Sequence, residues 1–127
     1  MEQYLIDNNA ISYFFSELLN DSAMQFMANV IDKIPNISVI TQIEALSWTN
    51  KDKNKESILK EFINDSNILF ITPNIVAECV RIRRSRKIKT PDAIIAATAI
   101  VNNFTLITAD ADFENIDNLK ILNPNKI

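Results

Sequence analysis

Four acidic residues that are far apart in the sequence occupy positions at which carboxylates can do chemistry. Asp7 directly follows the apolar run YLI, Glu44 lies about one helical turn after SVI, and Asp110 follows TLI after a Thr and an Ala. Asp92 comes two residues after Thr90 in TPDAIIAATAI, a pattern typical of the first turn of a helix. Each acid has an ordinary explanation as a helix cap or a solvated charge. Their joint occurrence at the ends of predicted strands and helices favours a shared site.

Such a group of carboxylates repels itself and therefore requires a cation. Carboxylate oxygens without imidazole or thiolate suit Mg²⁺ or Mn²⁺. An ion of this kind activates water and neutralises the charge that develops on a phosphate during attack, so hydrolysis of phosphodiesters is the natural use. Asp112, two residues after Asp110, either adds a further carboxylate or caps the last helix.

The composition excludes many other kinds of site. The chain has 127 residues, 47% of them hydrophobic, which is enough for the core of one domain. With no histidine and a single cysteine, it cannot form a Ser-His-Asp or Cys-His site, a zinc cluster or a disulfide framework. Without glycine it also lacks the Gly-rich loops that bind phosphates. Cys79 lies among apolar residues and is predicted to be a buried structural thiol.

Short apolar runs alternate with helical patterns along the chain. Strands are predicted at residues 3–6, 37–40, 68–71, 105–108 and 119–122. Helices are predicted at residues 10–19, 22–33, 42–48, 56–64, 73–86 and 91–101, the last two with Thr72 and Thr90 as N-caps. This alternation predicts a three-layer α/β/α sandwich with a mainly parallel sheet of about five strands. Ligands bind beyond the carboxyl ends of such strands, where the acids should lie.

Four segments occur in an order and spacing that match a known family. They are LIDNNAISYFF, SVITQIEAL, KIKTPDAIIAATAI and NNFTLITADADF, which together cover nearly the whole chain. The sequence resembles the PIN-domain ribonucleases, and among them the VapC-type toxins of type II toxin-antitoxin systems. The resemblance implies that residues 1–127 form a single PIN-like domain. It also implies an endoribonuclease that depends on Mg²⁺, with Mn²⁺ as a possible substitute, and that hydrolyses phosphodiester bonds in RNA.

The resemblance also implies which residues form the site. A set of acids would hold the metal and carry out catalysis, with one more acid as an additional ligand: Asp7, Glu44, Asp92 and Asp110, with Asp112 added. Asn8 stands where the family usually has Thr or Ser, and Asn9 fits the next position. Both are expected to support the site, because an amide can hydrogen-bond a carboxylate or a metal-bound water.

The run RIRRSRKIK concentrates positive charge immediately before Asp92. Because the whole chain carries −3, the remainder carries a net charge of −9. One interpretation is a solvated helix end, and another is a surface that binds RNA phosphates beside the acids. In toxins of this type, such cations can also meet an acidic or C-terminal segment of the antitoxin. The candidate RNA-binding residues are Arg81, Arg83, Arg84, Arg86, Lys87 and Lys89.

The partners and the location are expectations as well. The early helices are rich in large apolar residues, and a surplus of these would suit a homodimer face and a groove for a cognate antitoxin, both of which the resemblance implies. Periodicity alone cannot separate such surfaces from ordinary burial. No segment resembles a signal peptide or a membrane span, so a cytoplasmic protein without membrane contact is expected.

Two alternatives stay open at this stage. A PIN-shaped module that binds RNA or protein without cleaving it would have the same sequence pattern. A phosphoacceptor receiver domain has a similar length and alternation. It would need adjacent acids after the first strand and a lysine after the last, where this chain has Asn8, Asn9 and Asn123.

Overall fold

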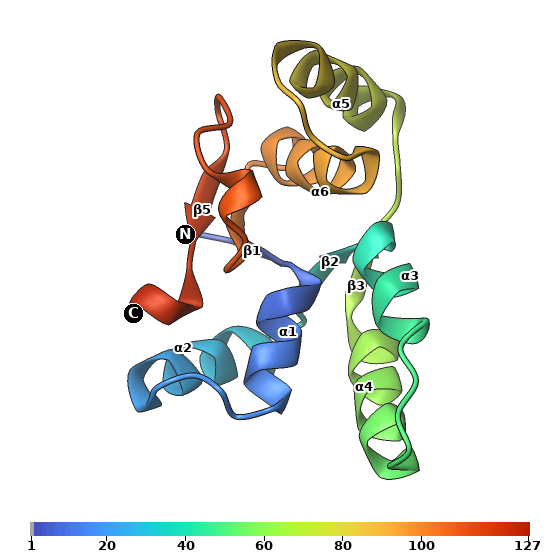
Figure 1. The fold of residues 1–127 in the computed structure, drawn as a ribbon, viewed down its shortest axis with the longest axis vertical. Coiled ribbons are helices and arrows are strands. Elements are labelled where there is room, and N and C mark those ends of the chain that lie inside the picture. Colours follow the sequence, from blue (N-terminus) through green and yellow to red (C-terminus); the bar gives the residue numbers. More distant parts are fainter. Residues whose placement is uncertain (1) are drawn as a thin grey trace.

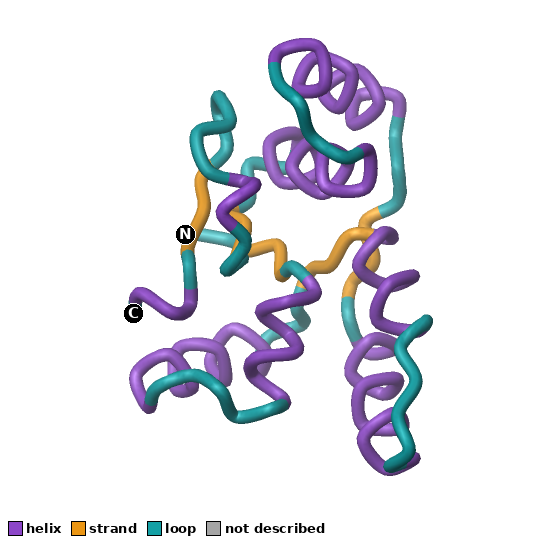
Figure 2. The backbone as a smooth tube through the Cα atoms, viewed as in Figure 1, coloured by secondary structure: helices purple, strands orange, loops and turns teal. Residues whose placement is uncertain are grey.

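A five-stranded sheet, in which all neighbouring strands are parallel, forms the centre of the molecule (Figure 1, Figure 2). The computed structural model describes residues 2–127. The strands lie in the order β3-β2-β1-β4-β5, which places β1 in the middle, between β2 and β4. The predicted sheet is therefore confirmed, with β5 at an edge as expected. The strands are β1 (Tyr4–Ile6), β2 (Asn36–Ser38), β3 (Asn67–Leu69), β4 (Thr105–Ile107) and β5 (Lys120–Leu122).

Helices cover both faces of this sheet. They are α1 (Asn8–Phe15), α2 (Asp21–Asp32), α3 (Val39–Leu46), α4 (Lys53–Asp65), α5 (Pro73–Ser85) and α6 (Thr90–Val101), with the 3-10 turns η1 (Ala111–Phe113) and η2 (Pro124–Lys126). Helices α5 and α6 lie on one side of the strands, and α1 and α2 lie on the other (Figure 1). The three-layer α/β/α sandwich predicted from the sequence is confirmed.

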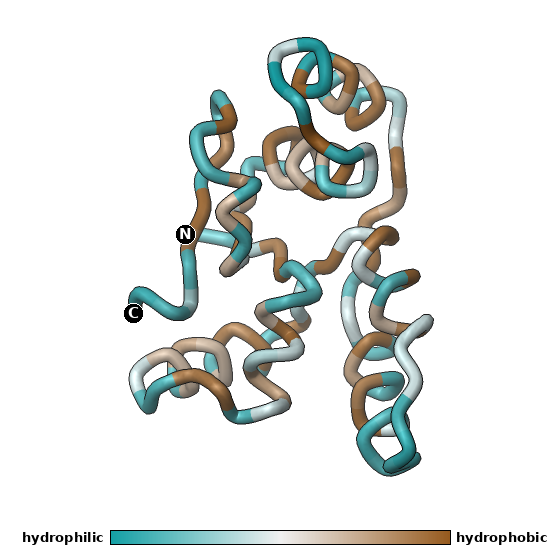
Figure 3. The backbone as a smooth tube through the Cα atoms, viewed as in Figure 1, coloured by the Kyte–Doolittle hydropathy of each residue, from teal (hydrophilic) through white to brown (hydrophobic). Residues whose placement is uncertain are grey.

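The alternation of side chains along the central strands builds two hydrophobic cores. Leu5 and Leu106 are paired in register and pack with residues of α5 and α6, whereas Ile6 and Ile107 pack with residues of α1 and α2. Helix α6 is buried nearly all round, as its Ala- and Ile-rich sequence predicts, and Figure 3 shows much of it as hydrophobic. The site described below therefore rests on a rigid support.

Several element boundaries differ from the predictions: α1 ends at Phe15 rather than at residue 19, β3 ends at Leu69 rather than at residue 71, and α3 begins at Val39 rather than at residue 42. Local capping explains the boundary between β2 and α3. The second strand was predicted to reach Ile40, but it ends at Ser38, whose hydroxyl accepts a hydrogen bond from Ile40 N at 3.1 Å and starts α3. Thr72 caps α5 as predicted. Thr90, in contrast, is already helical, because the N-cap of α6 is Lys89.

The chain turns sharply without glycine. Asn103, Asn115 and Asn118 have φ between 55° and 70°, in the left-handed region that Asn tolerates better than most residues. Asn103 ends α6, as the sequence indicates. Within residues 2–127, no helix has both the length and the apolar character needed to cross a membrane.

Candidate active site

Asp7 lies at the carboxyl end of the central strand, and its side chain is buried. It directly follows β1, is only 6% exposed, and caps α1 by accepting a hydrogen bond from Asn8 N at 2.8 Å. Its other oxygen accepts a hydrogen bond from the hydroxyl of Thr108 at 2.8 Å. Because Ile6 and Ile107 are paired in register, the residues that follow them leave the sheet side by side. The pairing of β1 with β4 thus fixes Asp7.

Thr108 connects several parts of the site. Its hydroxyl donates to Asp7 and accepts hydrogen bonds from Asp110 N at 3.1 Å and from the amide of Asn9 at 3.3 Å. The amide oxygen of Asn9 accepts in turn from Ala109 N at 3.1 Å. Sequence reasoning treated Thr108 only as the end of a strand and missed this role. Its position two residues before an aspartate was the one available signal, but Thr is also common in strands.

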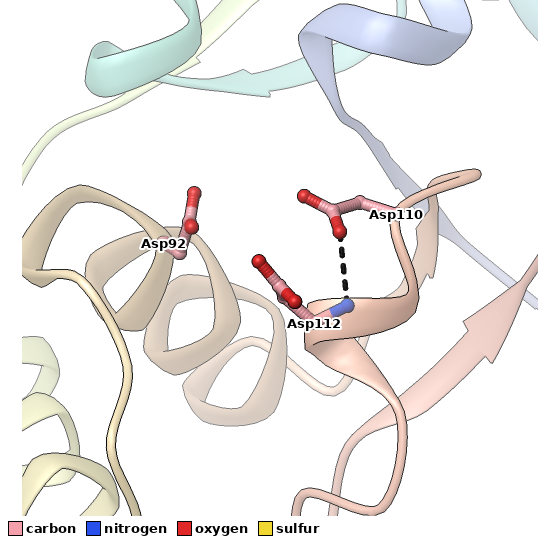
Figure 4. Close-up of side chains that lie close together, drawn as sticks. All are labelled: Asp92, Asp110 and Asp112. Atoms are coloured by element: carbon pink, nitrogen blue, oxygen red, sulfur yellow. Dashed lines mark hydrogen bonds between the residues drawn. The ribbon is translucent and has the colours of Figure 1, made fainter.

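Three further carboxylates, those of Asp92, Asp110 and Asp112, lie close together (Figure 4). Asp92, Asp110 and Asp112 each offer an oxygen, and these oxygens lie within 4.8 Å of one another. Asp92 is in the first turn of α6, whereas Asp110 is the N-cap of η1 and Asp112 lies in its first turn. One oxygen of Asp110 accepts a hydrogen bond from Asp112 N at 2.9 Å. The residue is therefore both a helix cap and a member of the group.

Asp7 and Glu44 are not part of that closest group, but they share its electrostatic field. Burial raises the pKa of Asp7 above its ordinary value, opposed by hydrogen bonds from Thr108 and the Asn8 amide. The charges of Asp92 and Asp110 raise it further.

The acids on α3 and α6 respond in the same way. Burial is the largest cause that raises the pKa of Glu44, and the charges of Asp7 and Asp92 add to the rise. Burial also raises the pKa of Asp92, followed by the charges of Asp110 and Asp112. Without a cation, these carboxylates oppose folding at neutral pH. The structure thus brings Asp92, Asp110 and Asp112 into one group, whereas Asp7 and Glu44 lie outside it and are linked to it by the effect of the neighbouring charges on their pKa values.

The donor set fits a hard divalent cation. Every candidate ligand atom is a carboxylate oxygen, the type that Mg²⁺ and Mn²⁺ prefer. Within residues 2–127 the only ion pairs are Lys53–Glu56 and Arg81–Glu78, so no Lys or Arg side chain is paired with a member of the group. A bound ion is the simplest way to compensate the repulsion.

The basic run divides into two sets of side chains. Arg81 hydrogen-bonds Glu78 and the carbonyl of Asp117, and Arg83 donates to the carbonyl of Ile88. Arg86 also donates to main-chain carbonyls. Three cations are exposed and form no hydrogen bond or ion pair within the described part of the chain: Arg84, Lys87 and Lys89. Lys89 also lowers the pKa of Asp92.

A groove of about 620 Å³ begins beside the acids. It runs between α1, α3 and α4, and its lining includes both Asn8 and Glu44. Three large apolar side chains in the lining remain more than a third exposed, namely Phe15, Trp48 and Ile58. Part of the apolar surplus of the early helices therefore faces this groove.

The chain combines a three-layer α/β/α fold with acids that lie beyond the carboxyl ends of parallel strands. The family model for the PIN domain matches residues 4–119, and the chain belongs to this family. PIN-domain proteins of the VapC kind are nucleases in general and typically use a divalent metal. No curated protein matches the sequence closely enough to count as a relative.

Solved structures share the fold over nearly the whole chain. VapBC2 from Rickettsia felis, bound to a DNA fragment from its promoter, is 24% identical with a TM-score of 0.77, and the match covers 94% of this chain and 97% of that one. A toxin-antitoxin complex from Klebsiella pneumoniae is 28% identical with a TM-score of 0.75, covering 96% and 98%. FitAcB from Neisseria gonorrhoeae is 20% identical with a TM-score of 0.75, covering 98% and 100%. The resemblance to VapC-type PIN proteins is confirmed.

Proposed function

We propose that this protein is a metal-dependent endoribonuclease and the toxin of a toxin-antitoxin pair. The observation that supports this best is the meeting of Asp92, Asp110 and Asp112, from two separate segments, in the field of the buried Asp7. A bound Mg²⁺, or Mn²⁺ in its place, would supply a water of lowered pKa and a positive charge beside the phosphate. RNA is the proposed substrate because the sequence motifs resemble ribonucleases of this family.

The side chains of the site have separate tasks in this proposal. Asp7, Glu44, Asp92 and Asp110 hold the ion, and Asp112 adds a ligand from the exposed side. The hydroxyl of Thr108 orients the carboxylate of Asp7 and favours its ionised form, because a hydrogen bond to a carboxylate stabilises the charge. Asn9 fixes the turn after β4. The side chain of Asn8 lies where it could bind a metal-bound water or the substrate.

The direct test is an RNA cleavage assay with Mg²⁺ or Mn²⁺, comparing the wild type with Asp7→Asn. We expect cleavage by the wild type, none in EDTA and none by the variant, because the amide removes a charged ligand. Asp65→Asn, which changes an exposed acid at the end of α4, should cleave like the wild type. Cleavage that persists in EDTA or in Asp7→Asn would show that the proposal is wrong. An RNA that is bound but never cut would favour the silent binding module.

Metal binding should also stabilise the fold. The carboxylates repel one another in the metal-free protein, so an ion that binds only the native state shifts the unfolding equilibrium. At about 100 times its dissociation constant, Mg²⁺ should add about 2.7 kcal/mol to the free energy of unfolding. Thermal melts with and without Mg²⁺ measure this gain, and Asp92→Asn should reduce it. An unchanged melting temperature of the wild type would contradict a metal site.

The exposed cations beside the acids are the proposed contacts for RNA phosphates. Replacing Arg84 and Lys87 by Glu should weaken binding at low salt. If each contacts one phosphate, their loss should reduce the slope of log affinity against log salt by about 1.4. The measurement is fluorescence anisotropy with labelled RNA in an Asp7→Asn background, and exchanging Lys60 and Lys126 for Glu provides the control. Equal slopes in both double variants would exclude a special role of the basic run.

The apolar surfaces suggest where partners bind. The groove between α1, α3 and α4 is the proposed site for an antitoxin segment, because its apolar lining continues to Glu44 and would bring the segment to the acids. A homodimer would use a second apolar face at the start of α5. Four large side chains are exposed there, namely Phe70, Ile71, Val76 and Val80. The likeness to VapBC complexes supports the antitoxin partner.

A further inference from the structure

Arg86 connects the end of α5 to the turn that carries two of the acids. It is the C-cap of α5 and has an extended backbone, which directs the chain away from the helix axis. One terminal nitrogen of its guanidinium donates to the carbonyl of Glu114 at 2.7 Å, and the other donates to the carbonyl of Asp112 at 3.2 Å. A planar guanidinium can bind two acceptors in a fixed geometry. Arg86 therefore holds a segment that is 26 and 28 residues away in the sequence.

The turn that Arg86 binds has few other attachments. Its start is fixed by Thr108, which accepts a hydrogen bond from Asp110 N, and its underside is fixed by Phe113, which is only 1% exposed. Asp112 itself is exposed and lies outside the sheet. Glu114 is the C-cap of η1, so the hydrogen bond from Arg86 to its carbonyl fixes the end of the turn. Without that contact, the next anchors after Phe113 would be the buried side chain of Ile116 and the hydrogen bond from Arg81 to the carbonyl of Asp117, both beyond the turn itself.

Arg86 does not form an ion pair with the neighbouring acids. The guanidinium binds main-chain carbonyls, and within residues 2–127 it takes part in no ion pair. The carboxylates of Asp110 and Asp112 thus remain available as ligands. A cation in this place would by simple electrostatics weaken the binding of a divalent ion, so its presence calls for a different explanation.

We propose that Arg86 is a positioning residue that keeps the η1 turn in the geometry in which Asp110 and Asp112 face Asp92. This inference rests on the proposed metal site and assigns Arg86 to its support, apart from the exposed cations of the same run. Side chains that orient metal ligands typically change metal affinity or activity by about 10- to 100-fold when removed. By electrostatics alone, removing a positive charge near the site should strengthen the binding of a cation. A loss of metal affinity would therefore point to positioning.

The test compares Arg86→Ala with Arg84→Ala, because both variants remove one positive charge from neighbouring positions. Mn²⁺ binding is measured by titration calorimetry, and amide hydrogen exchange of residues 110–115 is measured without metal. We expect Arg86→Ala to weaken Mn²⁺ binding at least about tenfold and to speed exchange in the turn. Arg84→Ala should leave exchange unchanged and bind Mn²⁺ as tightly as the wild type or slightly more tightly. Arg86→Lys keeps the charge but lacks the paired donors. Its Mn²⁺ affinity and exchange rate should lie between those of the wild type and of Arg86→Ala.

The outcomes separate this inference from the proposed nuclease. Wild-type affinity and exchange in Arg86→Ala would overturn the positioning role even if the wild type cleaves RNA. An equal loss of affinity in Arg84→Ala would overturn it as well, because the effect would then follow charge alone. A wild type that binds Mn²⁺ but leaves RNA intact would overturn the nuclease, while the role of Arg86 would stand. If Arg86→Ala does not fold, Arg86→Lys decides the question by the same two measurements.

Discussion

Replacing Asp92 by Asn is expected to abolish RNA cleavage and, at the same time, to stabilise the metal-free protein. Cleavage should fall by more than about 100-fold, because changes to residues that merely support a metal ligand already cost 10- to 100-fold. The gain in stability has an electrostatic cause. Burial and the charges of Asp110 and Asp112 raise the pKa of Asp92, so its ionised form is unfavourable in the native state. An amide of the same shape removes that cost.

The sign of the pH dependence provides an internal check. A carboxyl whose pKa is raised in the native state contributes stability below its unfolded pKa, and this contribution is lost as pH rises through the native pKa. The difference in unfolding free energy between Asp92→Asn and the metal-free wild type should therefore be large at pH 7. It should shrink at about pH 4, close to the ordinary pKa of an aspartate, because the raised pKa makes the native carboxyl bind a proton more readily there than at pH 7. Urea unfolding at both pH values measures it, and a variant less stable than the wild type at pH 7 would contradict repulsion among these acids.

Replacing Thr108 by Val should have the second largest effect. Val has nearly the same shape and keeps the strand propensity, but it removes the donor to Asp7 and the acceptor for Asp110 N and Asn9. Thr108 is 1% exposed, so water cannot replace these partners freely. A hydrogen bond to a charged group contributes about 1.5–3 kcal/mol, and the free energy of unfolding should fall by about that amount. Metal affinity should fall about 10- to 100-fold.

Thr98→Val is the matched control for this variant. Thr98 is also 1% exposed, but its hydroxyl donates only to the carbonyl of Ile94 within α6. Its loss should cost about 1 kcal/mol or less and leave metal affinity unchanged. Because the Thr108 hydroxyl lowers the pKa of Asp7, the loss of affinity in Thr108→Val should also grow as the pH falls. Equal effects of the two variants on metal affinity would show that Thr108 has no special role.

The architecture could be predicted because its signals are local. The central strands β1 and β4 contain short apolar runs, and caps such as Thr72 mark the starts of helices. The boundary between β2 and α3 was misplaced because Val39 and Ile40 are β-branched and resemble strand residues. The serine before them caps the helix, and that signal is weaker. The order of the strands, in contrast, depends on packing between distant segments.

The meeting of Asp92 with Asp110 and Asp112 was also predictable, because the joint occurrence of carboxylates at the ends of strands and helices favours a shared site over separate caps. The residues that hold the acids of the site in place could not be predicted. Thr108 contacts Asp7 across 101 residues, and nothing near it in the sequence reports that contact. Arg86 belongs to a run of cations that resembles a solvated helix end, and only the coordinates separate it from Arg84. Long-range hydrogen bonds of this kind leave no local pattern in a single sequence.

The pairing of β1 with β4 has a consequence for the synthesis of the protein. A nascent chain that has reached residue 104 already contains Asp7, Glu44 and Asp92, but not the neighbouring strand or the threonine that fix Asp7. Translation must therefore pass residue 112 before Asp92, Asp110 and Asp112 can meet. An unfinished polypeptide that ends before residue 105 is therefore expected to lack the arrangement of carboxylates that the proposed nuclease needs.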